Sequence, residues 1–184
     1  MKDKTLVILV GAPGSGKSTW RRKWHGAYVN PDAIRREKFG VQYDRQVEPA
    51  VWKIAYAELE KAMGEGLDVC FDATNLNPET RRPLIKMADR YGYKKKAVYF
   101  AVSLKTLLQR NEARPPGKIL AAEIIAGLYM RLKAPEMEEG FTEIEVIKEE
   151  DQDGEEDQDG EEGQDGEVRS ELKGKGHKKG KPKK

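Results

Sequence analysis

Gly-Ala-Pro-Gly-Ser-Gly-Lys-Ser-Thr, residues 11–19, is the stretch that decides the fold. It matches the Walker A pattern Gly-x-x-x-x-Gly-Lys-[Ser/Thr] from Gly11 to Ser18. Glycines let the backbone form a concave loop whose N–H groups converge on phosphate oxygens, and the N-terminal end of the next helix adds positive charge. The apolar run at 5–10, directly before the loop, is typical of a buried strand. The stretch therefore predicts a strand, a phosphate-binding loop and a helix.

The motif assigns a role to each of its residues. We expect Lys17 to reach the β- and γ-phosphates of a nucleotide and the Ser18 hydroxyl to ligate Mg²⁺. ATP is thus the expected phosphoryl donor and Mg²⁺ the expected metal. The loop residues predicted to contact ATP are Gly11, Ala12, Pro13, Gly14, Ser15, Gly16, Lys17, Ser18 and Thr19.

Apolar patterns with the period of a strand alternate with patterns that have the period of a helix. Strands are expected at 5–10, 27–29, 67–71, 94–102 and 142–148. Helices are expected at 17–24, 47–63, 78–91, 104–113 and 121–133, with a further helix entry at Pro31. This alternation predicts an α/β fold with a parallel sheet covered by helices on both faces, as in nucleotide-kinase-like P-loop NTPases.

The charges of the chain are unevenly placed. Residues 149–167 hold twelve acidic and no basic side chains in a hexapeptide repeat, and 169–184 hold eight basic and one acidic. Residues 1–148 keep 26 basic and 19 acidic residues, a net charge of +7 that suits a polyanionic partner or a solvated surface. The repeat has no apolar residue to offset its ordering entropy, so we predict a disordered tail at 149–184. Residues 1–148 are then the predicted P-loop kinase domain.

The remaining composition narrows the class of protein. Cys70 is the only cysteine, so no disulfide forms within one chain, and its apolar neighbours predict a buried thiol. No segment is long enough to predict a membrane span. We expect a cytoplasmic, intracellular protein with access to ATP and Mg²⁺.

Three further polar groups follow predicted strands, where ligands bind in open α/β sheets. Asp32 and Arg35 follow the second strand, and Asp72, Thr74 and Asn75 follow the third. The third group is a pair of arginines, Arg110 and Arg114, four residues apart on one helix face before a Pro-Pro-Gly break. That placement is typical of a mobile lid that closes on phosphates.

At these positions the chain resembles the kinase module of phage and related 5′-hydroxyl polynucleotide kinases. The resemblance runs from residue 4 to about 133, with its pieces in the same order. The matching pieces are residues 11–20, Asn30-Pro-Asp32 with Arg35, Thr74-Asn-Leu-Asn-Pro-Glu79 with Arg81 or Arg82, and Arg110-Asn-Glu-Ala-Arg114. The resemblance implies ATP-dependent phosphorylation of the 5′-hydroxyl end of DNA or RNA.

The resemblance also implies roles. Asp32 would be the general base toward the acceptor hydroxyl, and Arg35 would contact the acceptor phosphate. Arg114 would stabilise charge on the transferring group, with Arg110 as a lid contact beside ATP, and Lys17 would complete the catalytic set. Thr74 and Asn75 would lie at the acceptor site. Asp72 stays open between an acceptor or Mg²⁺-water ligand and a structural turn residue.

The chain departs from the family in two ways. Ala73 stands between Asp72 and Thr74, whereas some members place the aspartate directly before Thr-Asn. No Asp-x-Asp-x-Thr phosphatase motif follows Lys148, so kinase activity without 3′-end healing is expected.

Two other interpretations remain. A small-molecule kinase of the same superfamily, similar to the zeta-toxin kinases or acting on a nucleoside or sugar, shares the loop and an early aspartate. A nucleotide-binding adaptor whose tail recruits partners is the second. Asp32, Arg35 and Arg114 together argue against the adaptor, because a binding module needs no base on an acceptor side.

Truncation after Lys148 tests the domain boundary. We expect the melting temperature and the turnover at saturating substrate to stay unchanged, because the removed residues carry almost no apolar surface. Only the KM for an oligonucleotide at low salt should shift, and added salt should cancel the shift by screening. A large drop in melting temperature, measured by circular dichroism, would contradict the prediction.

Overall fold

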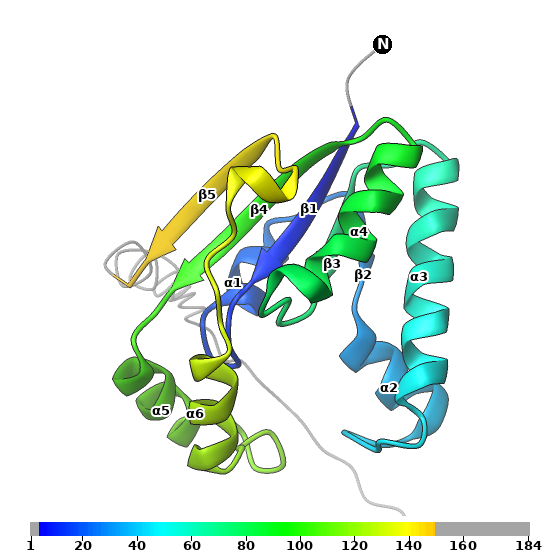
Figure 1. Cartoon of the computed structure of the whole chain (residues 1–184). Helices are drawn as coiled ribbons and strands as arrows, with labels where there is room; N and C mark the ends of the chain where they lie inside the picture. Colours follow the sequence, from blue (N-terminus) through cyan, green and yellow to red (C-terminus); the bar gives the residue numbers. More distant parts are fainter. Residues whose placement is uncertain (1–3, 150–184) are drawn as a thin grey trace, which may run out of the picture.

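The computed structural model describes residues 4–149, and within them five parallel strands form one sheet in the order β2–β3–β1–β4–β5 (Figure 1). The strands are β1 (Thr5–Val10), β2 (Ala27–Val29), β3 (Val69–Asp72), β4 (Lys94–Ala101) and β5 (Glu143–Lys148). The helices are α1 (Lys17–Arg22), α2 (Pro31–Phe39), α3 (Glu48–Gly64), α4 (Pro78–Arg90), α5 (Leu104–Glu112) and α6 (Ala122–Met130), with a 3-10 turn η1 (Met137–Glu139). The predicted tail, and with it the boundary after Lys148, lies outside the described residues except for Glu149.

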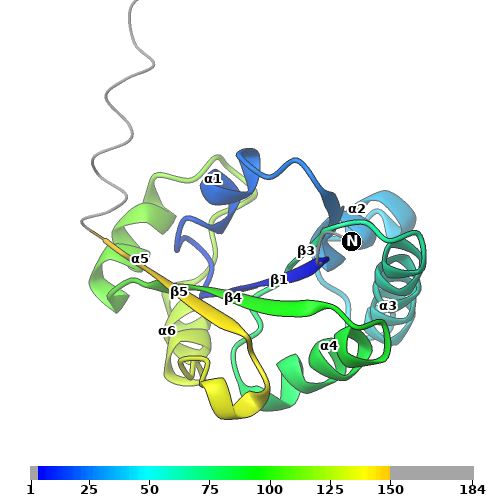
Figure 2. The same cartoon turned by 90° about the horizontal axis from the view of Figure 1, so that it is seen from above.

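The central strand β1 is buried on both faces, because helices cover the sheet on either side. Successive side chains of a strand point to opposite faces. Leu6, Ile8 and Val10 pack with α3 and α4, whereas Val7 and Leu9 belong to a second core with α5 and α6. Seen from above, the sheet runs between α1 on one side and α3 and α4 on the other (Figure 2). The predicted α/β fold is confirmed.

Three element boundaries differ from the expected ones by two residues or more: the start of β3 and the ends of α1 and α6. Leu67 does not start a strand, because its N–H donates to the Ala62 carbonyl behind Gly66, whose φ is 69°. This pair of features is a Schellman motif that ends α3. Helix α1 stops at Arg22, where the Trp24 indole turns back to donate to the Ala27 carbonyl.

The other differences lie toward the C-terminal end of the fold. Helix α6 ends at Met130, and Lys133 then donates its N–H to the Leu76 carbonyl at 2.7 Å. The turn η1 follows, which the sequence did not predict.

The thiol of Cys70 is buried, as predicted, and burial raises its pKa. Within residues 4–149, no helix combines the length and the apolar character that a membrane span requires.

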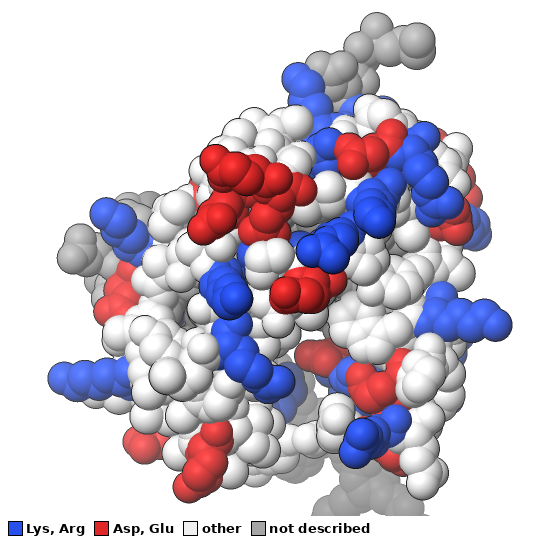
Figure 3. Space-filling model, in the orientation of Figure 1, with Lys and Arg blue, Asp and Glu red and all other residues white. Residues whose placement is uncertain are grey.

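A buried arginine joins α4 to η1. Arg81 is fully buried, and its guanidinium binds the Glu139 carboxylate through two hydrogen bonds of 2.8 and 2.5 Å. It also donates to the carbonyls of Asn75 and Lys133. Acidic side chains gather on the surface where Figure 1 places η1, which carries Glu138 and Glu139 (Figure 3). Arg81 is thus the cation that fastens this acidic turn to the loop after β3, whereas Arg82 is exposed.

Removing Arg81 tests this connection. Arg81→Met leaves the Glu139 carboxylate without its buried partner, so we expect the free energy of unfolding to fall by about 3–5 kcal/mol. Arg82→Met, the matched control at the next and exposed position, should change it by less than about 0.5 kcal/mol. Urea unfolding measures both. The double variant Arg81→Met/Glu139→Met should recover most of the loss, and equal effects of Arg81→Met and Arg82→Met would contradict the assignment.

Candidate active site

The phosphate loop connects β1 to α1 and is shaped by glycines. Gly14 and Gly16 have φ values of 86° and 97°, in the left-handed region that favours glycine. A Cβ on Gly11 would lie 2.5 Å from the Ser15 Oγ, so the loop leaves no room for a side chain there. The Ser15 hydroxyl is buried and has no hydrogen-bond partner within the described residues. The predicted loop is therefore present, with a concave interior.

Lys17 is the first residue of α1, and its side chain reaches back to this loop. Its Nζ donates to the carbonyls of Gly11 at 2.7 Å and Ala12 at 2.9 Å. Burial lowers the pKa of Lys17 to about 8; the charges of Asp72 and Asp32 act in the opposite direction, and that of Arg114 lowers the pKa further. A nearby anion stabilises the charged form of a buried lysine, so the site favours the binding of phosphate.

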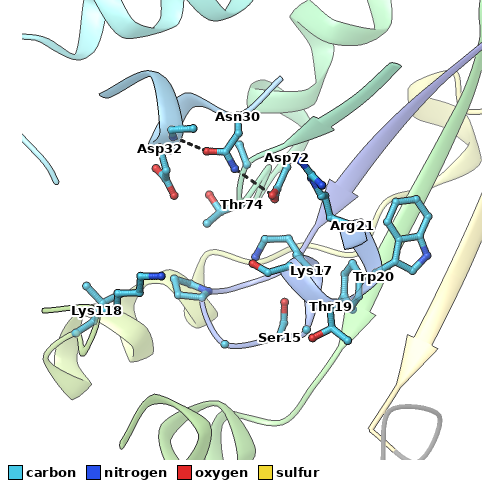
Figure 4. A pocket seen from close by; sticks show the side chains of 18 of the residues that line it. Ser15, Lys17, Thr19, Trp20, Arg21, Asn30, Asp32, Asp72, Thr74 and Lys118 are labelled. Atoms are coloured by element: carbon cyan, nitrogen blue, oxygen red, sulfur yellow. Dashed lines mark hydrogen bonds between the residues drawn. The ribbon is translucent and has the colours of Figure 1, made fainter. Parts of the chain in front are cut away.

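Asp72, the last residue of β3, lies within hydrogen-bonding reach of β2 and the start of α2. Its Oδ2 accepts a hydrogen bond from the Tyr28 hydroxyl at 2.7 Å. It accepts another from the Asn30 amide at 3.0 Å (Figure 4). Burial raises the pKa of Tyr28 above its ordinary value, and the Asp72 charge adds to the rise. The Arg21 guanidinium lies 3.9 Å from the centre of the Tyr28 ring. Asp72 is therefore a cleft residue held in one orientation.

Helix α2 carries the predicted acceptor-side residues. Asp32 stands in its first turn, and 72% of the side chain is exposed. Arg35 is buried, donates to Asp32 Oδ1 at 2.5 Å, and binds both oxygens of Glu48 at 2.6 and 2.9 Å. The bond to Glu48 is the main cause that raises the pKa of Arg35. Arg35 thus orients Asp32, and its predicted contact with an acceptor phosphate stays a prediction.

The loop after β3 runs beside the phosphate loop. The Thr74 carbonyl accepts the Gly11 N–H at 3.1 Å, and Thr74 also lines the cleft. Asn75, with φ of 45° and an exposed fraction of 2%, donates from its amide to the Leu9 carbonyl at 2.7 Å. The structure thus gives Asn75 a contact inside the protein, away from the expected acceptor site. Its acceptor role would need a rearrangement of this loop.

The two arginines that precede the Pro-Pro-Gly break both reach the cleft. Arg110 and Arg114 both line the cleft, at the end of α5 and just after it. Asn111 between them is buried and exchanges two hydrogen bonds with the backbone of Leu120, at 2.8 and 3.0 Å. The two ends of the loop between α5 and α6 are thereby held together. That this loop is a mobile lid stays a prediction.

One cleft brings these groups together. It extends from the phosphate loop past α2 to the loop between α5 and α6, and Gln42 donates to the Gly117 carbonyl across it at 2.5 Å. Basic side chains outnumber acidic ones on its wall. The basic residues include Arg21, Arg36, Lys38, Arg110, Arg114 and Lys118. Such a wall suits a ligand with several negative charges.

Two side chains that line the cleft carry oxygen atoms of the kind that ligate Mg²⁺. Ser18, exposed in the first turn of α1, and Asp72 both line the cleft. Mg²⁺ takes few protein oxygens and completes its shell with phosphates and water. Among residues 4–149, no cluster of three or more His, Cys, Asp or Glu side chains forms a separate metal site. Ser18 could hold a nucleotide-bound Mg²⁺, and this role stays a prediction.

Several residues of the site were not found from the sequence. No role was assigned to Tyr28, Asn30, Glu48 or Asn111, although Asn30 and Asn111 lie within segments that resemble the family. Each of the four acts through a partner in another segment. The Pro after Asn30 signals only the helix start. The position of Asp72 at the end of a strand made it a candidate site residue. The same rule does not identify Tyr28 and Asn30, which donate hydrogen bonds to it.

Comparisons with known proteins agree with this geometry. The family model described as "AAA domain" matches residues 6–126. A protein of Autographa californica nuclear polyhedrosis virus, described as a bifunctional polynucleotide kinase/RNA ligase, is 31% identical over 144 residues. That match covers 70% of this chain and 21% of the viral protein, so the chain spans about a fifth of the length of this relative.

Solved structures show the same fold. A chain of the Pnkp1/Rnl/Hen1 RNA repair complex matches with a TM-score of 0.64 and 26% identity, over 72% of this chain and 45% of that one. A sugar kinase from Janibacter sp. HTCC2649 matches with a TM-score of 0.56 and 15% identity, over 79% of this chain and 85% of that one. The second likeness concerns the fold alone.

Proposed function

The chain belongs to the AAA domain family of P-loop proteins, and from this premise we propose that it is an ATP-dependent kinase acting on the 5′-hydroxyl end of a nucleic acid. One observation carries the proposal. The carboxylate of Asp32 stands exposed on the cleft wall that also holds Lys17, so a base and a phosphate loop share one basic cleft. The likeness to the viral protein and to the RNA repair complex supports the acceptor class.

The donor side is built from the phosphate loop. The loop N–H groups and Lys17 would hold the β- and γ-phosphates of ATP, and Lys17 would exchange its two carbonyl contacts for phosphate oxygens. Mg²⁺, held by the Ser18 hydroxyl and the phosphates, would neutralise charge on the leaving group. Preorganised charge of this kind stabilises the transition state without a covalent intermediate.

The acceptor side is built from α2. The 5′-hydroxyl gives its proton to the Asp32 carboxylate while its oxygen forms a bond to the γ-phosphorus, and the bond from that phosphorus to the bridging oxygen breaks to release ADP. Arg35 orients Asp32 through Oδ1. Exposure of the side chain leaves the carboxylate accessible to a hydroxyl group.

The lid would complete the site. Arg110 and Arg114 line the cleft beside the phosphate loop, where their charges can meet the transferring phosphoryl group. Arg114 already lies close enough to Lys17 to lower its pKa, so both cations converge on the same place. An anion between them would relieve the repulsion.

A small-molecule kinase is the second candidate. The fold shared with the sugar kinase favours it. The basic wall, which extends well beyond the phosphate loop to Lys38 and Lys118, favours a longer polyanion instead. Cytoplasmic location remains an expectation of the sequence.

Substitutions of Lys17 and Asp32 test the donor side and the acceptor side of the site separately. Lys17→Ala should reduce transfer from γ-labelled ATP to a 5′-hydroxyl oligonucleotide to background. Asp32→Ala should lower turnover about a hundredfold or more while ATP affinity stays unchanged, because Asp32 serves the acceptor. Asp89→Ala, an exposed aspartate on α4, is the control and should behave as wild type. Wild-type turnover of Asp32→Ala would refute the base assignment.

The salt dependence of binding tests the acceptor class. If the basic wall holds a strand, the affinity for a single-stranded oligonucleotide should fall with salt by a log–log slope of about 0.7 for each phosphate neutralised. ATP affinity should fall less steeply. A flat response, together with equal turnover of a free nucleoside or sugar, would favour the small-molecule kinase.

A further inference from the structure

The Asn30 side chain forms hydrogen bonds through both its oxygen and its nitrogen. Its Oδ1 accepts the Ala33 N–H at 2.6 Å, which caps the N-terminus of α2. Its Nδ2 donates to the Asp72 Oδ2 at 3.0 Å and to the Tyr28 hydroxyl oxygen at 2.8 Å. Figure 4 shows the cap and the bond to Asp72 as dashed lines across the cleft wall. Asn30 therefore joins the first turn of α2 to the end of β3.

This connection lies between the two halves of the site. Helix α2 carries Asp32 two residues after Asn30, and β3 ends at Asp72, whose charge acts on Lys17. The strand that leads to α2 is short, since β2 has three residues and pairs along one edge with β3. Helix α2 also contacts α3, where Arg35 binds Glu48, and this contact does not involve the phosphate loop.

We propose that Asn30 is a positioning residue: by fastening α2 to Asp72, it sets where Asp32 stands relative to the phosphate loop. The proposal rests on the proposed function, in which Asp32 receives the acceptor proton. Near-attack geometry is sensitive to displacements of about 1 Å, so a loosened helix start costs turnover and not nucleotide affinity. Tyr28 supports the same contact, because its hydroxyl donates to the same carboxylate oxygen.

One substitution of Asn30 can remove its bond to Asp72 and keep its capping of α2. Aspartate and asparagine cap helices equally well, and a carboxylate also suits the N-terminal end of the helix. Asn30→Asp keeps the oxygen that accepts the Ala33 N–H, but it removes both amide donors and places a second carboxylate against Asp72. A residue that only caps α2 would tolerate this change. A residue that ties α2 to β3 would not.

Asn77 provides the matched control. It caps α4 with the same geometry, since its Oδ1 accepts the Thr80 N–H at 3.1 Å, and α4 begins outside the cleft wall. Asn77→Asp therefore makes the same chemical change at a cap whose helix does not carry Asp32. Asn30→Ser is the second test variant, because serine keeps a capping oxygen and adds no charge.

The experiment compares these variants in the full chain. For Asn30→Asp we expect kcat to fall about 10- to 100-fold with the KM for ATP within twofold of wild type. Asn30→Ser should fall less, and Asn77→Asp should match wild type. Hydrogen exchange of the amides at 31–39 should quicken in both Asn30 variants and stay unchanged in Asn77→Asp.

The two readouts together can overturn the proposal. Wild-type kcat and wild-type exchange in Asn30→Asp would reduce Asn30 to a cap. If Asn30→Asp does not fold, Asn30→Ser decides the matter, and wild-type exchange with wild-type kcat per folded molecule again overturns it. Hydrogen exchange needs no acceptor, so a wild-type protein that fails to phosphorylate a 5′-hydroxyl refutes the proposed function while the tie is still judged by exchange.

Discussion

The hydrogen bond from the Gly11 N–H to the Thr74 carbonyl holds the donor site in place, because it joins the phosphate loop to the loop after β3. Further contacts extend from that point. The Asn75 amide donates to Leu9 at the end of β1, and the buried Arg81 donates to the Asn75 carbonyl. Loops carry the chemistry of open α/β sheets, so their precision depends on such contacts with the strands.

The same region contains a buried hydroxyl group without a hydrogen-bond partner in residues 4–149 and a buried cation. The Ser15 hydroxyl is buried without a partner among the described residues, and Lys17 is a cation whose pKa burial lowers to about 8. Buried polar groups without partners cost free energy. A bound phosphate would improve the surroundings of the Lys17 charge. A ligand bound in the loop would therefore offset part of this cost.

Sequence reasoning predicted the donor half of the site better than the acceptor half, for a physical reason. The phosphate loop is a local motif, since residues 11–18 fold against one another and their glycines are required by backbone conformation. The order of strands and helices also follows from local periodicity, which is why the fold was predicted. The ties around α2 join residues 42 and 44 positions apart, and the bond of Arg81 to Glu139 spans 58. Such pairs have no spacing rule, so only the folded chain brings them together.

Local environment also gives the two aspartates of the cleft different capacities, although the residue type is the same. Asp72 is buried, and its Oδ2 already accepts two hydrogen bonds, from Tyr28 and Asn30. Asp32 accepts one bond from Arg35 at Oδ1 and is largely exposed. A carboxylate that must take a proton from an incoming hydroxyl needs an accessible oxygen, and one that must hold geometry needs occupied oxygens. In the proposed reaction, Asp32 would therefore take the proton, and Asp72 would support the helix on which Asp32 stands.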